Sequence, residues 1–403
     1  MADHPTNDAI ALISGAFWGR NPHDELRWMR ENAPVYRDDE SNAWGLAKHR
    51  DVRYASLHPE IFSSAGGIRV ETGRLPMMID MDDPEHLSRR RLVNRGFTPR
   101  RVAAQEDRIR MICDGLIDRV CERGTCDFVW DLAAPLPLIV IGDALGVAPE
   151  DREDLMRWSD DMLRGLTGIS DDTELIRAGE AFEEYQAYVS TVIADRRAGP
   201  REDLISVLVH AETDGERLDH DSLVYESLLI LIGGDETTRH VLSGGAYQLF
   251  QHPEQRRKLI DDPEGIPVAV EEMLRWVSPI KNMNRTATRD VELGGQLIRK
   301  GDNVLLLYPS ANRDADVFTA PDRFDVGRRP NDHIAFGLGG HFCLGNSLAR
   351  LELRVMFERL LSRLPDMEPV EEEEPAYRAA NFVSGYESMP VRFTPAPPVG
   401  DGG

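Results

Sequence analysis

A single cysteine in a glycine-rich segment constrains this chain more than any other feature. The segment reads Phe336-Gly337-Leu338-Gly339-Gly340-His341-Phe342-Cys343-Leu344-Gly345 and leads into a helical apolar pattern over 348–361. Its glycines permit positive φ angles and let the backbone approach a flat ligand closely. A thiolate at a helix start faces backbone N–H groups, which stabilise its negative charge. The pattern predicts that Cys343 is a metal ligand, and a buried structural cysteine is the alternative.

Length and composition limit the number of domains and the class of protein that the chain can form. Although 403 residues would suffice for two or three domains, the chain shows no break or internal repeat, so we expect one domain over 1–403 with a disordered Pro/Gly-rich tail over 395–403. No apolar run approaches the roughly 18 residues of a membrane span, and residues 1–7 lack the features of a signal peptide. Four cysteines do not make a disulfide framework, which favours a reducing cytoplasm, and we interpret Cys121 and Cys126 as structural.

Helical periodicity dominates the chain. It predicts helices over 24–31, 85–95, 100–121, 132–145, 150–163, 173–197, 219–250, 253–260 and 267–276. Strand patterns are short and predict a hairpin over 35–47, paired strands over 285–307 around Gly294-Gly295, and a last pair within 377–393. The expected fold class is mainly α with a minor β part.

The longest predicted helix contains an unusual polar string. The apolar run 228–232 is followed by Gly233-Gly234-Asp235-Glu236-Thr237-Thr238. Acids beside so apolar a stretch are costly unless they are used or paired. The two glycines weaken the helix by about 1 kcal/mol each, which favours a local widening that can hold water or dioxygen. A charged surface turn is the alternative.

Two charged patterns lie elsewhere. Glu272 and Arg275 are one helical turn apart and share a face. Six arginines without an acidic neighbour lie within 89–101, on a chain whose formal net charge is −23. That net charge argues against nucleic acid as a partner, whereas the basic patch suits an acidic protein. A solvated helix face is the alternative for the patch.

Together these strings resemble the cytochrome P450 enzymes. The Phe-x-x-Gly-x-x-x-Cys-x-Gly pattern is similar to the haem-binding loop of that family, and the resemblance runs from Glu25 to Pro395. It implies the cytochrome P450 fold and haem b (iron protoporphyrin IX) as the cofactor. Cys343 would then be the iron ligand, with Phe336, Gly337 and Gly345 forming the loop around it.

The resemblance also implies roles for other residues. Glu236 and Thr237 match the acid and the hydroxyl of the family's proton relay, with Asp235 facing away. Glu272 and Arg275, with Arg323 from Pro321-Asp322-Arg323-Phe324, match a buried network that supports the haem loop. The positions matching propionate partners are His86, Arg90, Arg285 and His341.

At finer detail the chain resembles actinobacterial steroid side-chain C26/C27 monooxygenases, in the strings 75–84, 228–240 and 380–385. This implies hydroxylation of the terminal methyl of cholesterol or cholest-4-en-3-one, and oxidation onward to the acid. The candidate substrate contacts are apolar, which suits a large, flat lipid. They are Met77, Met78, Ile79, Ile232, Gly233, Met283 and Phe382.

The resemblance further implies dioxygen as a substrate and a separate electron donor, because we find no reductase segment in the 403 residues. We expect a ferredoxin with its ferredoxin reductase, docking on Arg89, Arg91, Arg95, Arg100 and Arg101. The alternatives are the same fold acting on a fatty acid or terpene, a peroxide-driven variant, and a non-catalytic haem sensor or carrier.

Overall fold

The computed structural model describes residues 5–165, 172–212, 215–370 and 374–400. Its α-helices are α1 (Gly15–Trp18), α2 (His23–Asn32), α3 (His49–Leu57), α4 (Glu85–Val93), α5 (Pro99–Ala103), α6 (Glu106–Asp118), α7 (Pro135–Leu145), α8 (Arg152–Arg164), α9 (Asp172–Ala198), α10 (Leu204–His210), α11 (His220–Gln251), α12 (Pro253–Asp261), α13 (Ile266–Val277), α14 (Tyr308–Ala311) and α15 (Asn346–Arg363). Short 3-10 turns include η1 (Met78–Asp80) and η6 (Gly339–His341), and η3 (Phe128–Ala133) is a π-helical turn. The predicted mainly helical class is confirmed.

One predicted helix is divided. The pattern over 100–121 forms α5 and α6, separated by a turn at Ala104 and Gln105. Val102 and Ile109 both enter the core on either side of this turn. They are seven residues apart and therefore in helical phase, so periodicity alone does not reveal the break.

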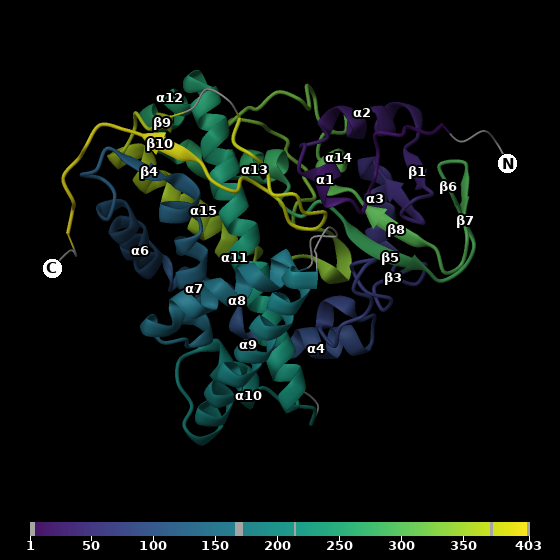
Figure 1. Ribbon diagram of the computed structural model, residues 1–403, viewed down its shortest axis with the longest axis horizontal. Helices are drawn as coiled ribbons and strands as arrows, with labels where there is room; N and C mark the ends of the chain where they lie inside the picture. Colours follow the sequence, from purple (N-terminus) through teal and green to yellow (C-terminus); the bar gives the residue numbers. More distant parts are fainter. Residues whose placement is uncertain (1–4, 166–171, 213–214, 371–373, 401–403) are drawn as a thin grey trace.

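Helix α11 runs through the middle of the molecule (Figure 1). It begins where the Asp219 carboxylate accepts a hydrogen bond from the Ser222 N–H at 2.8 Å, an N-cap that satisfies one of the free donors of the first turn. Helices α7, α13 and α15 pack against it and contribute to the largest apolar core. Most of α11 is therefore buried, and its buried residues lie on several sides of the helix rather than in one stripe.

The largest sheet lies at one side of the helical part of the molecule (Figure 1). A five-stranded sheet has the order β1-β2-β8-β5-β3, with β2 and β8 parallel and the other neighbours antiparallel. The strands are β1 (Val35–Asp38), β2 (Ala43–Leu46), β3 (Phe62–Ser63), β5 (Met283–Ala287) and β8 (Asn303–Leu306). The predicted hairpin over 35–47 is confirmed as β1 and β2.

Two smaller sheets complete the β part. Strands β6 (Val291–Leu293) and β7 (Gln296–Ile298) form the expected hairpin around Gly294 and Gly295, which both have positive φ. The other sheet contains β4 (Thr125–Asp127), β9 (Glu368–Pro369) and β10 (Pro390–Arg392). The pair predicted within 377–393 is reduced to one bridge, Tyr377 to Tyr386, because β10 pairs with β4 and β9 instead.

One described segment, Phe128–Leu145, is long and apolar enough to cross a membrane, with a mean hydropathy of 1.6. Two aspartates interrupt it, and 67% of it is buried within the fold. Its η3 and α7 parts both pack on α11. This is the composition of a core helix as much as that of a membrane span.

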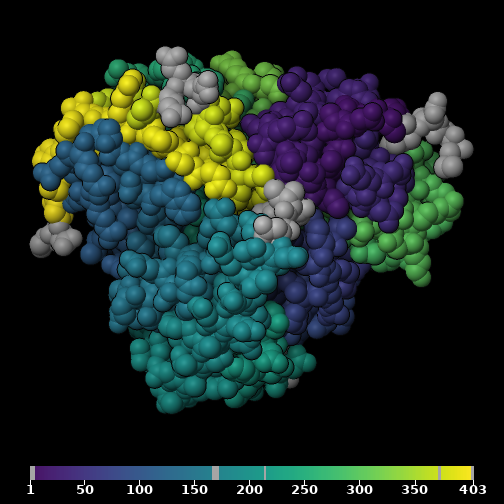
Figure 2. All heavy atoms as spheres, viewed as in Figure 1, coloured from purple at the N-terminus to yellow at the C-terminus, as the bar shows by residue number. Residues whose placement is uncertain are grey.

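The two ends of the chain pack onto other elements. Figure 2 shows the N-terminal part in purple beside C-terminal residues in yellow, and the Asn381 side chain donates to the Ile13 carbonyl at 2.8 Å. Within the tail that we expect to be disordered over 395–403, the N–H groups of Val399 and Gly400 donate to the Asp118 carboxylate at the end of α6, both at 3.1 Å. Residues 401–403 lie outside the described part of the chain.

Candidate active site

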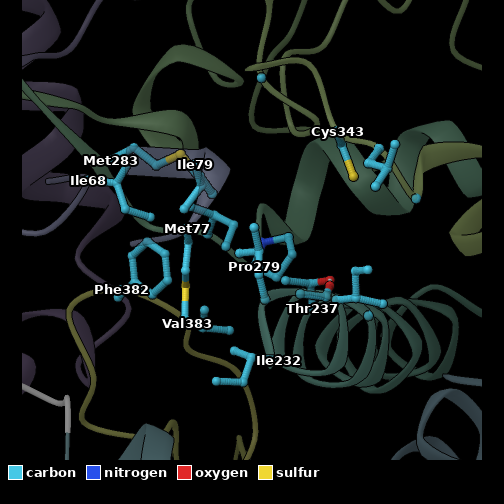
Figure 3. Close-up of a pocket in the computed structure, with 18 of the residues that line it drawn as sticks. Ile68, Met77, Ile79, Ile232, Thr237, Pro279, Met283, Cys343, Phe382 and Val383 are labelled. Carbon is cyan, nitrogen blue, oxygen red and sulfur yellow. The ribbon is translucent and has the colours of Figure 1, made fainter. Parts of the chain in front are cut away.

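A cavity of about 660 Å³ lies between α11 and the cysteine loop. Figure 3 shows the sulfur of Cys343 on one side of it and Thr237 and Ile232 of α11 on another, with Ile68, Met77, Ile79, Met283 and Phe382 grouped farther from the cysteine. Its lining is largely apolar, with a few polar side chains among the lining residues. Such a cavity accepts a large apolar molecule and orients it against a few polar groups.

The loop around Cys343 is held by its own backbone. The Cys343 N–H donates to the Phe336 carbonyl at 2.9 Å, and Gly337 and Gly339 take φ angles of +68° and +71°. Burial raises the pKa of the Cys343 thiol, while the N–H groups of Gly345 and Asn346 and the charge of Arg90 act in the opposite direction. The sulfur therefore lies where donors favour its anionic form as soon as a metal replaces its proton.

Four cationic or donor side chains line the cavity near this loop: His86, Arg90, Arg285 and His341. The His86 and His341 rings lie against each other, with centroids 4.1 Å apart and planes tilted by 33°, and Arg90 donates to the Phe342 carbonyl. Burial, followed by the charge of Arg285, lowers the pKa of His341 to about 3, so its ring is neutral near pH 7. The predicted grouping of these four residues is thus seen in the structure.

These residues fit a haem. His86 Nε2 is buried without a hydrogen-bond partner among the described residues, although its ring lines the cavity. A Cβ added at Gly345 would meet no atom within 4 Å, and one at Gly337 would meet none closer than 3.8 Å, which leaves the loop open to a flat ligand. A thiolate, a glycine-lined face and cationic partners for two carboxylates are the donor set that a haem requires.

On the opposite side, α11 presents its glycine–threonine string. The helix remains α-helical through Gly233 and Gly234, so the expected widening is absent. Space arises instead from the missing side chain of Gly233, where an added Cβ would meet no atom within 4 Å. Thr237 lines the cavity and its hydroxyl donates to the Gly233 carbonyl at 2.8 Å.

The two acids of the string lie behind this surface. Asp235 accepts from the Ser159 hydroxyl at 3.1 Å and is not part of the cavity lining, in agreement with the expectation that it faces away. Glu236 is fully buried and pairs with Arg239, with His240 Nε2 at 3.3 Å and with Arg378 at 3.3 Å. Its carboxylate thus does not reach the main cavity directly.

Arg378 continues this polar cluster toward solvent. It donates to Asp160 at 2.8 Å and to Glu387 at 3.1 Å, and Glu387 is partly exposed. A water-sized void of about 10 Å³ lies between Glu236, Arg378 and cavity-lining Phe382. Arg378 could not be predicted from the sequence, because it is distant in the chain from α11 and belongs to no recognisable spacing.

The Glu272–Arg275 pair is present, but its third member was predicted wrongly. Arg328 Nε donates to Glu272 at 2.9 Å, whereas the Arg323 side chain is 66% exposed and lies 4.0 Å from Asp325. Phe324 is buried in the core, so the preceding Arg323 points outward. The chain then turns, with the Arg328 N–H donating to the Asp325 carbonyl, and brings Arg328 back to Glu272.

All seven predicted substrate contacts line the cavity. Sequence reasoning missed the contribution of α9 and of the first part of α11, since these residues match no local motif. The missed residues include Leu175, Ala178, Gly179, Phe182, Tyr225, Leu228, Leu229 and Ile230, together with Ile68 and Arg69.

The arginine patch divides into outward and inward members. Arg91, Arg95, Arg100 and Arg101 are exposed. The Arg89 side chain is only 17% exposed and pairs with the buried Glu226 at 3.3 Å. Arg89 is therefore part of the interior contacts of α4, which its position in the basic run does not reveal.

The chain resembles known proteins along nearly its whole length. The family model described as "Cytochrome P450" matches residues 266–385. A steroid C26-monooxygenase of Mycolicibacterium smegmatis is 51% identical over 99% of this chain and 100% of that protein, and one of Mycobacterium tuberculosis is 54% identical over 97% and 98%. The crystal structure of CYP109E1 from Bacillus megaterium in complex with testosterone superposes with a TM-score of 0.85, at 34% identity over 93% of this chain and 99% of that one.

Proposed function

This chain belongs to the cytochrome P450 family of monooxygenases, and we propose that it hydroxylates the terminal methyl group of a steroid side chain. The substrate we propose is cholesterol or cholest-4-en-3-one, oxidised at C26 or C27 and onward to the carboxylic acid. The observation that carries this proposal is the identity of 51% to 54%, along nearly full length, to two steroid C26-monooxygenases. The large apolar cavity supports it.

We propose haem b as the cofactor, held by Cys343 at the iron and by His86, Arg90, Arg285 and His341 at the propionates. Phe336, Gly337 and Gly345 would shape the loop beneath the ring. When bound, a thiolate-ligated haem iron activates dioxygen for insertion into a C–H bond. A protein without Cys343 should therefore lack the Soret band of a reduced, CO-bound haem thiolate.

The chain's own residues would orient the substrate and supply protons. The apolar side chains of Met77, Met78, Ile79, Ile232, Met283 and Phe382 would hold the hydrocarbon, with Gly233 leaving room beside α11. Thr237 Oγ1, which donates a hydrogen bond to the Gly233 carbonyl, would turn its proton into the cavity. Glu236 would relay a replacement proton from the cluster around Arg378 through intervening water, because its carboxylate does not reach the cavity directly. Thr237→Ala and Glu236→Gln should then form less product for each NADH consumed.

We infer that the electrons come from a small acidic ferredoxin with its reductase, and that the protein works in the cytoplasm. Four exposed arginines, Arg91, Arg95, Arg100 and Arg101, support a docking surface of this charge on an otherwise acidic chain. Opposite charges on the two proteins would raise the rate of encounter.

Spectral titration followed by product identification tests the proposal. We expect cholest-4-en-3-one to shift the Soret band of the holoprotein at lower concentration than any member of a fatty-acid and terpene panel. We also expect ferredoxin, reductase and NADH to yield the terminal alcohol and then the acid. Tighter binding of a fatty acid, with no steroid product, would show that the substrate is a fatty acid and not a steroid. Absence of turnover on every ligand would favour a haem sensor or carrier.

A further inference from the structure

Glu226 is a buried carboxylate outside the cluster described above. It lies on α11, six residues before the cavity-lining Ile232, and its side chain is completely buried. Its Oε1 accepts from the Met78 backbone N–H at 2.8 Å and from Arg89 at 3.3 Å. One carboxylate thus joins three elements, which are α11, α4 and the segment that begins η1.

The segment tied to Glu226 forms one wall of the cavity. Asp80 closes this segment into a loop, because its carboxylate accepts from the Ile68 N–H at 2.8 Å and from the Leu75 N–H at 2.7 Å. Met77, Met78 and Ile79 of this loop line the cavity, as do Ile68 and Leu75. Asp80 fixes the loop's internal shape, whereas Glu226 ties it to the helix on which Thr237 lies.

The bond between Glu226 and Met78 has no ready replacement. A buried backbone N–H without an acceptor costs about as much as a lost hydrogen bond, and a buried carboxylate needs its donors even more. Burial raises the pKa of Glu226 to about 7, against the opposing effects of Arg89 and the Met78 N–H. If the contact were lost, the loop would move to satisfy the N–H elsewhere, and its methionine side chains would move with it.

We propose that Glu226 is a positioning residue for the substrate, which fixes Met77, Met78 and Ile79 against the bound hydrocarbon through the Met78 N–H, with Arg89 as its counter-ion. The identity of that hydrocarbon as a steroid side chain rests on the function proposed above. The role of Glu226 rests on the described contacts alone. Arg89 is accordingly assigned to substrate positioning and removed from the docking surface.

Met78 offers a matched pair of variants. It is the first residue of η1, and the preceding Met77 is extended, with φ −110° and ψ 150°. Proline is tolerated at the first position of a helical turn and favours an extended residue before it. Met78→Pro therefore removes the N–H donor together with the side chain, whereas Met78→Ala removes the side chain and keeps the donor. The difference between the two isolates the hydrogen bond to Glu226.

The experiment measures the ligand Kd by Soret titration of haem-loaded protein, with haem content and Tm recorded in parallel. We expect Glu226→Leu to raise the ligand Kd about tenfold over wild type. The Kd of Met78→Pro should be about tenfold higher than that of Met78→Ala. The Kd of Glu226→Gln should stay within about threefold of the wild-type value, because the glutamine amide oxygen can still accept the hydrogen bond. A purely structural role would lower Tm or haem content and leave these Kd ratios near one.

Equal Kd values for Met78→Pro and Met78→Ala would overturn the proposal, and so would a wild-type Kd in haem-loaded Glu226→Leu. If Glu226→Leu does not load haem, the comparison of the Kd values of Met78→Pro and Met78→Ala decides whether the proposal holds. The ligand used is the member of the steroid, fatty-acid and terpene panel that shifts the Soret band of the wild-type protein at the lowest concentration. A wild type that binds only a fatty acid would therefore contradict the steroid proposal, while the variant ratios would still decide the role of Glu226.

Discussion

Arg275 donates two hydrogen bonds to the Glu272 carboxylate in the interior of the protein, from Nε at 2.7 Å and from Nη2 at 2.8 Å. Both side chains are completely buried. The carboxylate also accepts from Arg328 Nε at 2.9 Å, from the Asp325 N–H at 2.9 Å and from the Asn331 side-chain amide at 3.3 Å. Glu272 thus joins α13 to the chain that leads toward the cysteine loop.

This arrangement predicts different effects for two nearby arginines. Arg328→Ala leaves a buried carboxylate with one cation fewer, and it also frees the carbonyl acceptors of Arg328, so we expect a loss of about 3 kcal/mol and poor haem retention. Arg323→Ala removes an exposed side chain and should change stability by less than about 0.5 kcal/mol. Chemical unfolding and haem content of the two variants provide the measurement. Equal effects would contradict the assignment of Arg328.

The contrast also shows what the sequence can and cannot predict. Glu272 and Arg275 were predictable because helical spacing places them on one face. The choice between Arg323 and Arg328 depends on which way an irregular segment turns, and no period governs such a segment. The contact between Glu226 and Arg89 was equally unpredictable, since it joins residues 137 positions apart in the sequence. Helix positions and the cysteine loop followed from local pattern, whereas Arg378 and the α9 wall of the cavity required the tertiary fold.

Gly385 is predicted to accept no side chain. A Cβ there would lie 2.3 Å from His240 Nδ1 and 2.5 Å from its Cγ. The His240 ring is buried, and its other nitrogen faces Glu236, so the ring has little room to move aside. Gly385→Ala should destabilise the protein by about 1–3 kcal/mol. In the double variant with His240→Ala the added cost should largely disappear, giving a strong coupling in the mutant cycle.

The matched control for this glycine is Gly115 in α6, where an added Cβ would meet no atom within 4 Å. Gly115→Ala should be neutral or stabilising, by up to about 1 kcal/mol, because alanine is the better helix former. Urea unfolding of the four variants is the measurement. Additive effects of Gly385→Ala and His240→Ala would rule out the steric contact.

Charge reversal at the exposed arginines should slow electron transfer. We predict that Arg91→Glu, Arg95→Glu, Arg100→Glu and Arg101→Glu, combined, reduce the rate of reduction by the ferredoxin at low ionic strength and flatten its dependence on salt. The steroid Kd should be unchanged. The internal comparison is Arg89→Ala, whose main expected effect is on steroid binding. Stopped-flow reduction rates at several salt concentrations test this, and wild-type rates would reject the docking surface.

Lys281 gives the protein a pH-dependent stability that can be isolated. Its ammonium is buried at the end of α13, where it donates to the Val277 carbonyl at 3.4 Å and the Ser278 carbonyl at 3.2 Å. Burial, with repulsion from Arg313, lowers the pKa of Lys281 to about 7. An unfolded lysine keeps a pKa near 10.4, so between about pH 7 and 10 the unfolded chain holds a proton that the folded chain lacks.

The free energy of unfolding therefore rises with pH through this interval, and the penalty for burying the charge is complete only below about pH 7. Lys281→Met removes this contribution and leaves every other titrating group in place. The stability of the variant relative to wild type should thus be greater at pH 6.5 than at pH 9, by about 2 kcal/mol. Urea unfolding of both proteins at the two pH values measures the difference. A relative stability that is the same at both would show that the Lys281 ammonium is not destabilised by its site.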